Sequence, residues 1–189
     1  QLTLLSSSQI KSLSPEQLGA MKLAYLTTAQ VSALTADQIS NATAVVVSSL
    51  SPDQFEAFSS QQISALTVPQ INALTASQVA RLDSTELQSL NDEQLAALSE
   101  KQIAGLSTAH ISTLLALSAL PFSESQVAGI STAAVAALTA SQIGYFSEDQ
   151  IRGLSSTQVR AMTATQLNGL NEYKLQAVGE GALAAVSTA

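Results

Sequence analysis

Large apolar residues recur along the chain at a spacing that alternates between three and five residues. From Thr27 to the unit that begins at Gly179, this frame holds over 20 units of eight residues, here called octads, whose first residue is position 0. Position 4 is large and apolar except at Ala119, and position 7 is apolar and larger than alanine except at Ala42. Residues three apart share a helix face, whereas strands alternate with a period of two. The spacing therefore predicts helices.

The polar positions predict where each helix begins. Position 0 is Ser or Thr in 15 of the 20 octads, and position 3 is Gln or Glu in 14. This is a capping box, in which the hydroxyl accepts from the backbone N–H three residues on and the position-3 side chain accepts from the N–H of the cap. Pro15 and Pro52 each follow a Ser, at the first helical position, where no N–H is needed. We expect every octad to start a new, very short helix.

Two other architectures fit the pattern less well. In one continuous helix, an octad turns the chain by about 800°, so the apolar stripe would drift by about 80° per octad and bury nothing coherently. Pro52, Pro69 and Pro121 would also interrupt such a helix. A β-solenoid would favour β-branched filler, but the filler here is Ala and Gln. We therefore predict an all-α fold, a solenoid of short capped helices.

A longer period groups the octads in threes. From the octad that begins at Ser99 onward, position 1 is Glu in every third octad, which gives the acidic ladder Glu100, Glu124, Glu148 and Glu172. Helices this short are unstable alone, so they must stack. We expect three octads to complete one coil, with each octad stacked on the third one before it and the ladder along one edge. Recent duplication of blocks of three octads, with another geometry, is the alternative.

The frame divides the chain into three segments. Residues 27–170 make up six regular coils, and residues 171–189 form degenerate repeats that suggest an array truncated from a longer one. Residues 1–26 hold irregular octads with five extra residues, Lys22 to Leu26, which we expect to lengthen the preceding helix. Open coil ends would allow head-to-tail stacking with another copy of the chain.

One octad, residues 115–122, keeps its length but loses both the cap and the Gln. It is very apolar, and two interpretations stay open: a buried, irregular turn, or an exposed patch that binds a partner protein. The residues of this candidate partner patch are Leu114, Leu115, Leu117, Leu120 and Phe122.

Composition and charge limit the chemistry. The net charge of −7 and the pI of about 4.5 disfavour binding to nucleic acid. The chain has no cysteine, and no apolar run approaches the roughly 18 residues of a membrane span. Its one histidine, His110, stands at position 3, where a capping role is expected, and a lone His builds neither a metal site nor a catalytic pair. We predict no enzyme activity, no catalytic or metal-binding residue, and no cofactor.

Two protein families share parts of this pattern. The segments LSPEQLGAM at 13–21 and LSPDQFEAF at 50–58 resemble the first helix of TAL-effector repeats, although the repeats of that family are much longer and carry a base-reading loop. The segments ALTASQVARL, ALTVPQINAL and ALTASQIGYF resemble octapeptide arrays in very large, adhesin-like bacterial secreted or surface proteins. The second resemblance covers nearly the whole chain and implies a rod-like extracellular element.

These observations favour a structural function. We expect a rigid spacer or display stalk of a large bacterial exoprotein, located outside the cell or on its surface. A protein-binding scaffold that uses the solenoid surface is one alternative, and the repeat domain of a secreted effector or toxin is another.

Overall fold

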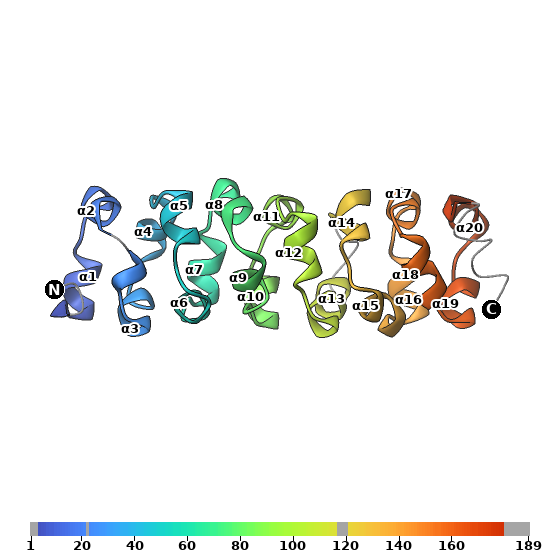
Figure 1. Ribbon diagram of the computed structural model, residues 1–189, viewed down its shortest axis with the longest axis horizontal. Coiled ribbons are helices and arrows are strands. Elements are labelled where there is room, and N and C mark those ends of the chain that lie inside the picture. The colour runs from blue at the N-terminus through green and yellow to red at the C-terminus, as the bar shows by residue number, and fades with distance from the viewer. Residues whose placement is uncertain (1–3, 22, 117–120, 180–189) are drawn as a thin grey trace. The chain divides into compact units, whose positions relative to one another are not determined.

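The computed structural model describes residues 4–21, 23–116 and 121–179. The chain divides into two compact units, Gln1–Ala97 and Leu98–Ala189. Figure 1 labels the helices of both units. Within the described ranges every regular element is a helix, and no strand occurs. The predicted all-α class is therefore confirmed.

The described residues of the first unit include the short α-helices α1 to α11 and the 3₁₀ turn η2. Their bounds are α1 Ser7–Lys11, α2 Pro15–Ala20, η2 Leu23–Tyr25, α3 Thr28–Val31, α4 Ala36–Ser40, α5 Ala44–Ser48, α6 Pro52–Glu56, α7 Ser60–Ser64, α8 Val68–Ala73, α9 Ala76–Val79, α10 Ser84–Gln88 and α11 Asp92–Ala96.

The second unit is built from helices of the same kind. Their bounds are α12 Glu100–Ala104, α13 Thr108–Leu115, α14 Glu124–Ala128, α15 Thr132–Ala137, α16 Ala140–Gly144, α17 Glu148–Arg152, α18 Ser156–Ala161, α19 Ala164–Asn168 and α20 Glu172–Ala177.

The predicted cap starts each regular octad. In α18, the cap residue Ser155 has extended backbone angles (φ −68°, ψ 157°), its hydroxyl accepts from the N–H of Gln158, and the Gln158 side chain accepts from the N–H of Ser155. At the end of the octad, the N–H of Met162 donates to the carbonyl of Val159 at 3.1 Å, and the chain then turns into the next cap. One octad is thus one short helix and one turn.

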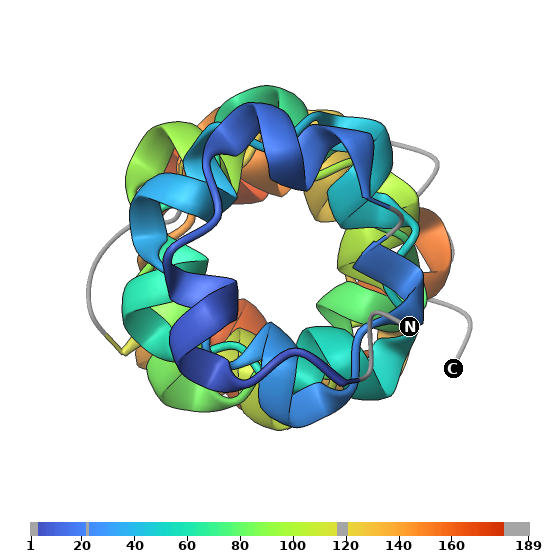
Figure 2. The same ribbon diagram turned by 90° about the vertical axis from the view of Figure 1, so that its left-hand side faces the viewer.

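Helices that belong to every third octad pack against each other within each unit. In the first unit α5 packs on α8 and α6 on α9, and in the second α15 packs on α18 and α16 on α19. Seen end-on, the helices of a unit are arranged around that unit's own centre (Figure 2). This packing of an octad on the third one along confirms the prediction of three octads per coil.

Positions 4 and 7 fill the centre of each unit. Val159 and Ile151 at position 4 are each 1% exposed, and Phe146 at position 7 is equally buried. Burial of these side chains at about 25 cal/mol per Å² of apolar area supplies the stability that such short helices lack on their own.

The five extra residues near the N-terminus do not lengthen a helix, so that prediction is wrong. Helix α2 ends at Ala20, Met21 is extended (φ −94°, ψ 143°), and Leu23–Tyr25 form the separate 3₁₀ turn. Residues three apart lie on the same side of a 3₁₀ turn. Leu23 and Leu26 therefore both enter the core, where each is 3% exposed, and this burial favours the turn over a longer helix.

Candidate functional surfaces

The glutamine at position 3 joins one coil to the one before it. In Gln158, Oε1 accepts from the N–H of Ser155 at 2.6 Å, while Nε2 donates to the carbonyl of Ile130 at 2.6 Å. The same Nε2 lies 3.0 Å from the carbonyl oxygen of Val127. One amide group thus caps the start of its own helix and satisfies the carbonyls at the end of a helix in the preceding coil.

This arrangement recurs in both units with a constant sequence offset. The Nε2 atom donates to the carbonyl 28 residues back, at distances of 2.6 to 3.0 Å, from further glutamines that include Gln38, Gln54, Gln62, Gln70, Gln78, Gln94, Gln126, Gln150 and Gln166. These side chains are 0 to 8% exposed. A buried amide needs partners for both its oxygen and its nitrogen, and the stack of coils provides them.

Sequence reasoning identified the oxygen's role in the capping box but missed the donation by the nitrogen. One signal was present. Position 3 is Gln in 13 octads and Glu in one, Glu86, although either residue completes a capping box. Because only the amide can donate a hydrogen bond at neutral pH, this bias toward Gln indicates a second partner for its nitrogen.

Other residues at position 3 keep part of this role. Lys174 donates from Nζ to the carbonyl of Gly144 at 2.6 Å, so its ammonium group replaces the amide nitrogen. His110 accepts from the N–H of Ser107 through Nδ1 at 3.2 Å, which confirms its predicted capping role. This contact requires an unprotonated Nδ1.

The acidic ladder lies on exposed positions of the second unit. Glu100, Glu124, Glu148 and Glu172 are the first residues of α12, α14, α17 and α20, and α17 packs on both α14 and α20. A carboxylate at a helix start is favoured by the helix dipole, which accounts for the residue type. At Glu100 and Glu124, a glycine of the following coil, Gly129 and Gly153 respectively, lies close to the backbone of the ladder residue.

The close approach explains the small residues at position 6. A Cβ atom added to Gly153 would lie 2.5 Å from the carbonyl oxygen of Glu124, and one added to Gly129 would lie 2.6 Å from that of Glu100. No described residue has the positive φ that favours glycine, so conformational freedom is not the reason for these glycines. The contact between coils itself excludes a side chain.

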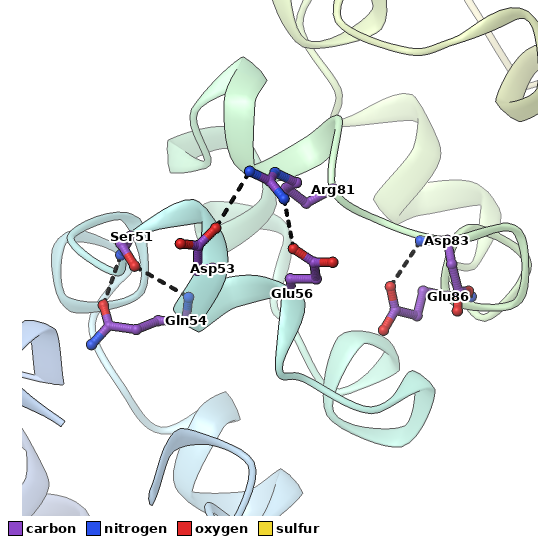
Figure 3. Close-up of polar contacts among 7 residues, drawn as sticks. All are labelled: Ser51, Asp53, Gln54, Glu56, Arg81, Asp83 and Glu86. Carbon is purple, nitrogen blue, oxygen red and sulfur yellow. Dashed lines mark hydrogen bonds and ion pairs between the residues drawn. The ribbon is translucent and has the colours of Figure 1, made fainter. Parts of the chain in front are cut away.

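Two arginines bind carboxylates across neighbouring coils. Arg152 lies 2.6 Å from Asp149 and 3.3 Å from Glu124, and these two carboxylates, Asp149 foremost, raise the pKa of the guanidinium group. Arg81 contacts Glu56 at 2.8 Å and Asp53 at 3.3 Å (Figure 3). All of these side chains are about half exposed or more, so water and salt screen each pair and it contributes little to stability.

The candidate partner patch is not exposed where it is described. Leu114, Leu115 and Phe122 are 4%, 0% and 5% exposed, and α13 continues to Leu115 as a helix. Leu117 and Leu120 lie outside the described residues. The three described side chains belong to the core, and they offer no surface to a partner.

The described residues meet the requirements of neither a metal site nor a membrane span. In residues 4–21, 23–116 and 121–179, no three His, Asp or Glu side chains are close enough together to hold a metal ion. Over the same ranges, no helix has both the length and the apolar character to cross a membrane. Isolated apolar side chains are exposed, among them Val45 at 75% and Tyr173 at 67%.

The chain matches no family among the protein families compared with it, and no curated protein matches it either.

Proposed function

We propose that this chain is a structural repeat segment, a rigid spacer or display stalk without catalytic activity. One observation carries the proposal: the buried glutamines, whose amide groups bind the octad to which they belong and the preceding coil at once. Polar bonds of fixed offset between successive coils resist bending and sliding more specifically than apolar contacts do. A stack held in this way keeps a fixed length, which is the property that a spacer requires.

The setting of this spacer rests on the resemblance described above. We propose that it belongs to a large bacterial exoprotein and lies outside the cell or on its surface. Its length would then be set by the number of coils, because each coil contacts its neighbours and adds a constant rise. Stacking against another copy of the chain, end to end, would extend the spacer further.

A distance measurement tests rigidity and additivity together. The chain has no cysteine, so cysteines placed at the exposed positions Ser125 and Tyr173 can carry two spin labels within the second unit. Each position follows an N-cap by two residues, and the two octads concerned are two coils apart. Stacked helices lie about 8–10 Å apart, so we expect a narrow distribution near 16–20 Å.

A second copy of residues 123–146, without the cysteine and inserted after residue 146, lies between the two labels. It should lengthen the distance between them by about 8–10 Å and leave the distribution narrow. An insert of Gly and Ser residues of the same length is the matched control and should broaden it. If the duplicated coil broadened the distribution as much as the flexible insert did, the rigid spacer would be refuted.

A further inference from the structure

Glu86 occupies the place of the glutamine in octad 83–90, at the start of α10. Its Oε2 atom accepts from the N–H of Asp83 at 2.9 Å, and Asp83 Oδ1 accepts from the N–H of Glu86 at 2.8 Å (Figure 3). The residue is 8% exposed. One carboxyl oxygen thus does what the glutamine oxygen does in the other octads, which Figure 3 shows for Gln54 and Ser51.

The sequence offset shared by the other octads indicates which carbonyl corresponds to the second carboxyl oxygen of Glu86. In the octads on either side, Gln78 donates to the carbonyl of Leu50 at 3.0 Å and Gln94 to that of Leu66 at 2.6 Å, each 28 residues back. The same offset from Glu86 leads to Phe58, at the end of the octad that contains α6. An ionised carboxylate has no hydrogen to donate to that carbonyl, whereas a protonated one has.

The surroundings of Glu86 favour its neutral form. Burial raises the pKa of this carboxyl, the N–H of Asp83 acts in the opposite direction, and the negative charges of Asp83 and Glu56 raise the pKa further. Helix α7, which packs on α10, contains no charged residue.

The nearby charges do not offset this effect. Arg81, which stands two residues before the cap Asp83, is bound to Glu56 and Asp53. On the following helix, α11, Asp92 and Glu93 are exposed and negative. The charged groups around Glu86 are thus mostly acidic, with one guanidinium group already engaged by two carboxylates.

We propose that Glu86 is a proton-operated link between two coils of the first unit. A proton taken from solvent gives Glu86 an O–H group that donates to the carbonyl of Phe58, as a glutamine amide does elsewhere. Loss of that proton leaves the carbonyl without a donor and places a negative charge in a buried site. The first unit would therefore be more firmly joined in mildly acidic than in neutral solution.

The sign of the pH dependence follows from the raised pKa in the folded state. The contribution of Glu86 to stability is complete below the ordinary pKa of a glutamic acid, about 4.3, and is lost as the pH rises through the higher folded-state pKa. Other carboxyl groups of the chain also titrate over this pH range. The contribution of Glu86 is therefore measured as the difference in melting temperature between wild type and a variant that cannot titrate at this position.

The experiment uses Glu86→Gln, which installs the residue that most other octads carry and should fold. At pH 8, we expect its melting temperature to exceed that of wild type by about 4–8 °C, the shift that corresponds to one buried hydrogen bond in a unit of this size. Between pH 8 and pH 4.5 this difference should shrink toward zero. A difference that stayed constant over this range would overturn the proposal.

A reciprocal variant serves as a control for effects that arise only from the helix propensities of Glu and Gln. Gln62 donates to the carbonyl of Leu34 at 2.7 Å in the same unit, so Gln62→Glu should create a second proton-operated link. We expect a melting temperature lower than wild type at pH 8 and recovery at pH 4.5. In addition, the ¹³C signal of the Glu86 carboxyl should titrate above the ordinary range of glutamic acid, and a midpoint within or below that range would also overturn the proposal.

Discussion

Helices α15 and α18 stack directly in the second unit, one coil apart, yet they bind their neighbours differently. In α18, Gln158 completes the capping box and donates to two carbonyls of the preceding coil. In α15, position 3 is Ala134, which is fully buried, and the hydroxyl of Ser131 caps the helix by accepting from its N–H at 3.2 Å. Both helices bury the valine at position 4, Val135 and Val159.

This difference separates two roles that most octads combine: formation of the short helix and hydrogen bonding to the preceding coil. A hydroxyl cap and a buried apolar pair suffice to form the short helix, because α15 exists without the glutamine. The glutamine adds the bonds between coils, and its loss elsewhere would leave buried carbonyls and an N–H group without partners. Variants at the two kinds of position, and at the contacts around them, can test this separation.

The largest effect is expected from Gln158→Ala in α18. The substitution removes the acceptor of the Ser155 N–H and the donor to Ile130 and Val127. Since each buried polar group left without a partner costs about 1–3 kcal/mol, we expect a loss of about 3 kcal/mol in the free energy of unfolding, measured by urea denaturation.

Gln142→Ala is the matched control for this loss. Gln142 completes the same capping box, but it is only partly buried, and its bond to the Ser112 carbonyl is longer, at 3.3 Å. Its loss should cost about 1 kcal/mol, since water can replace its contacts. Equal losses in the two variants would show that the bonds between coils contribute nothing beyond the cap.

A smaller loss is expected from Gly153→Ala, which tests the backbone contact between coils. The new methyl group would meet the carbonyl oxygen of Glu124 at 2.5 Å and its Cα at 2.6 Å, so the coils must shift apart at a cost of about 1–3 kcal/mol. Thermal unfolding followed by circular dichroism measures this cost.

Gly144→Ala is the control at a place without such a contact. Nothing lies within 4 Å of its added Cβ, and Gly144 is the last residue of α16. Here we expect a slight stabilisation, about 0.5–1 kcal/mol, because alanine favours a helix more than glycine does. A destabilisation as large as that of Gly153→Ala would contradict the explanation by close approach.

The smallest effect is expected from Arg152→Gln, which removes the ion pairs to Asp149 and Glu124. Because these side chains are at least half exposed, the free energy of unfolding measured by urea denaturation should be almost unchanged, and any small difference should disappear at about 1 M salt. A loss comparable to that of Gln158→Ala would mean that exposed charges, and not buried amides, join the coils.

The sequence predicted the fold well because its local and longer-range signals agree. The hydroxyl at position 0 and the apolar residues at positions 4 and 7 define one octad, and the recurrence of glutamate at Glu124 and Glu148, three octads apart, indicated the coil. Capping depends on residues three apart, so it can be read from a single stretch of chain.

The contacts between coils were harder to predict because they join groups 28 to 31 residues apart. The pattern indicated a glutamine but not the carbonyls of Val127 and Ile130 that bind it. The turn at Leu23–Tyr25 was missed for a related reason. Its conformation follows from the burial of Leu23 and Leu26, a tertiary effect that outweighs the tendency of the helix to continue.

The three-octad coil also determines which changes in length a gene for such a chain can absorb. Within a unit, removal of three consecutive octads deletes one full turn and leaves every later octad above one of its own kind, so a small residue again faces the close approach, as Gly153 does above Glu124. Removal of a single octad turns everything that follows by one third of a revolution, so side chains larger than glycine would arrive at the close approach. Recombination between repeats should therefore be tolerated in multiples of three octads and selected against otherwise.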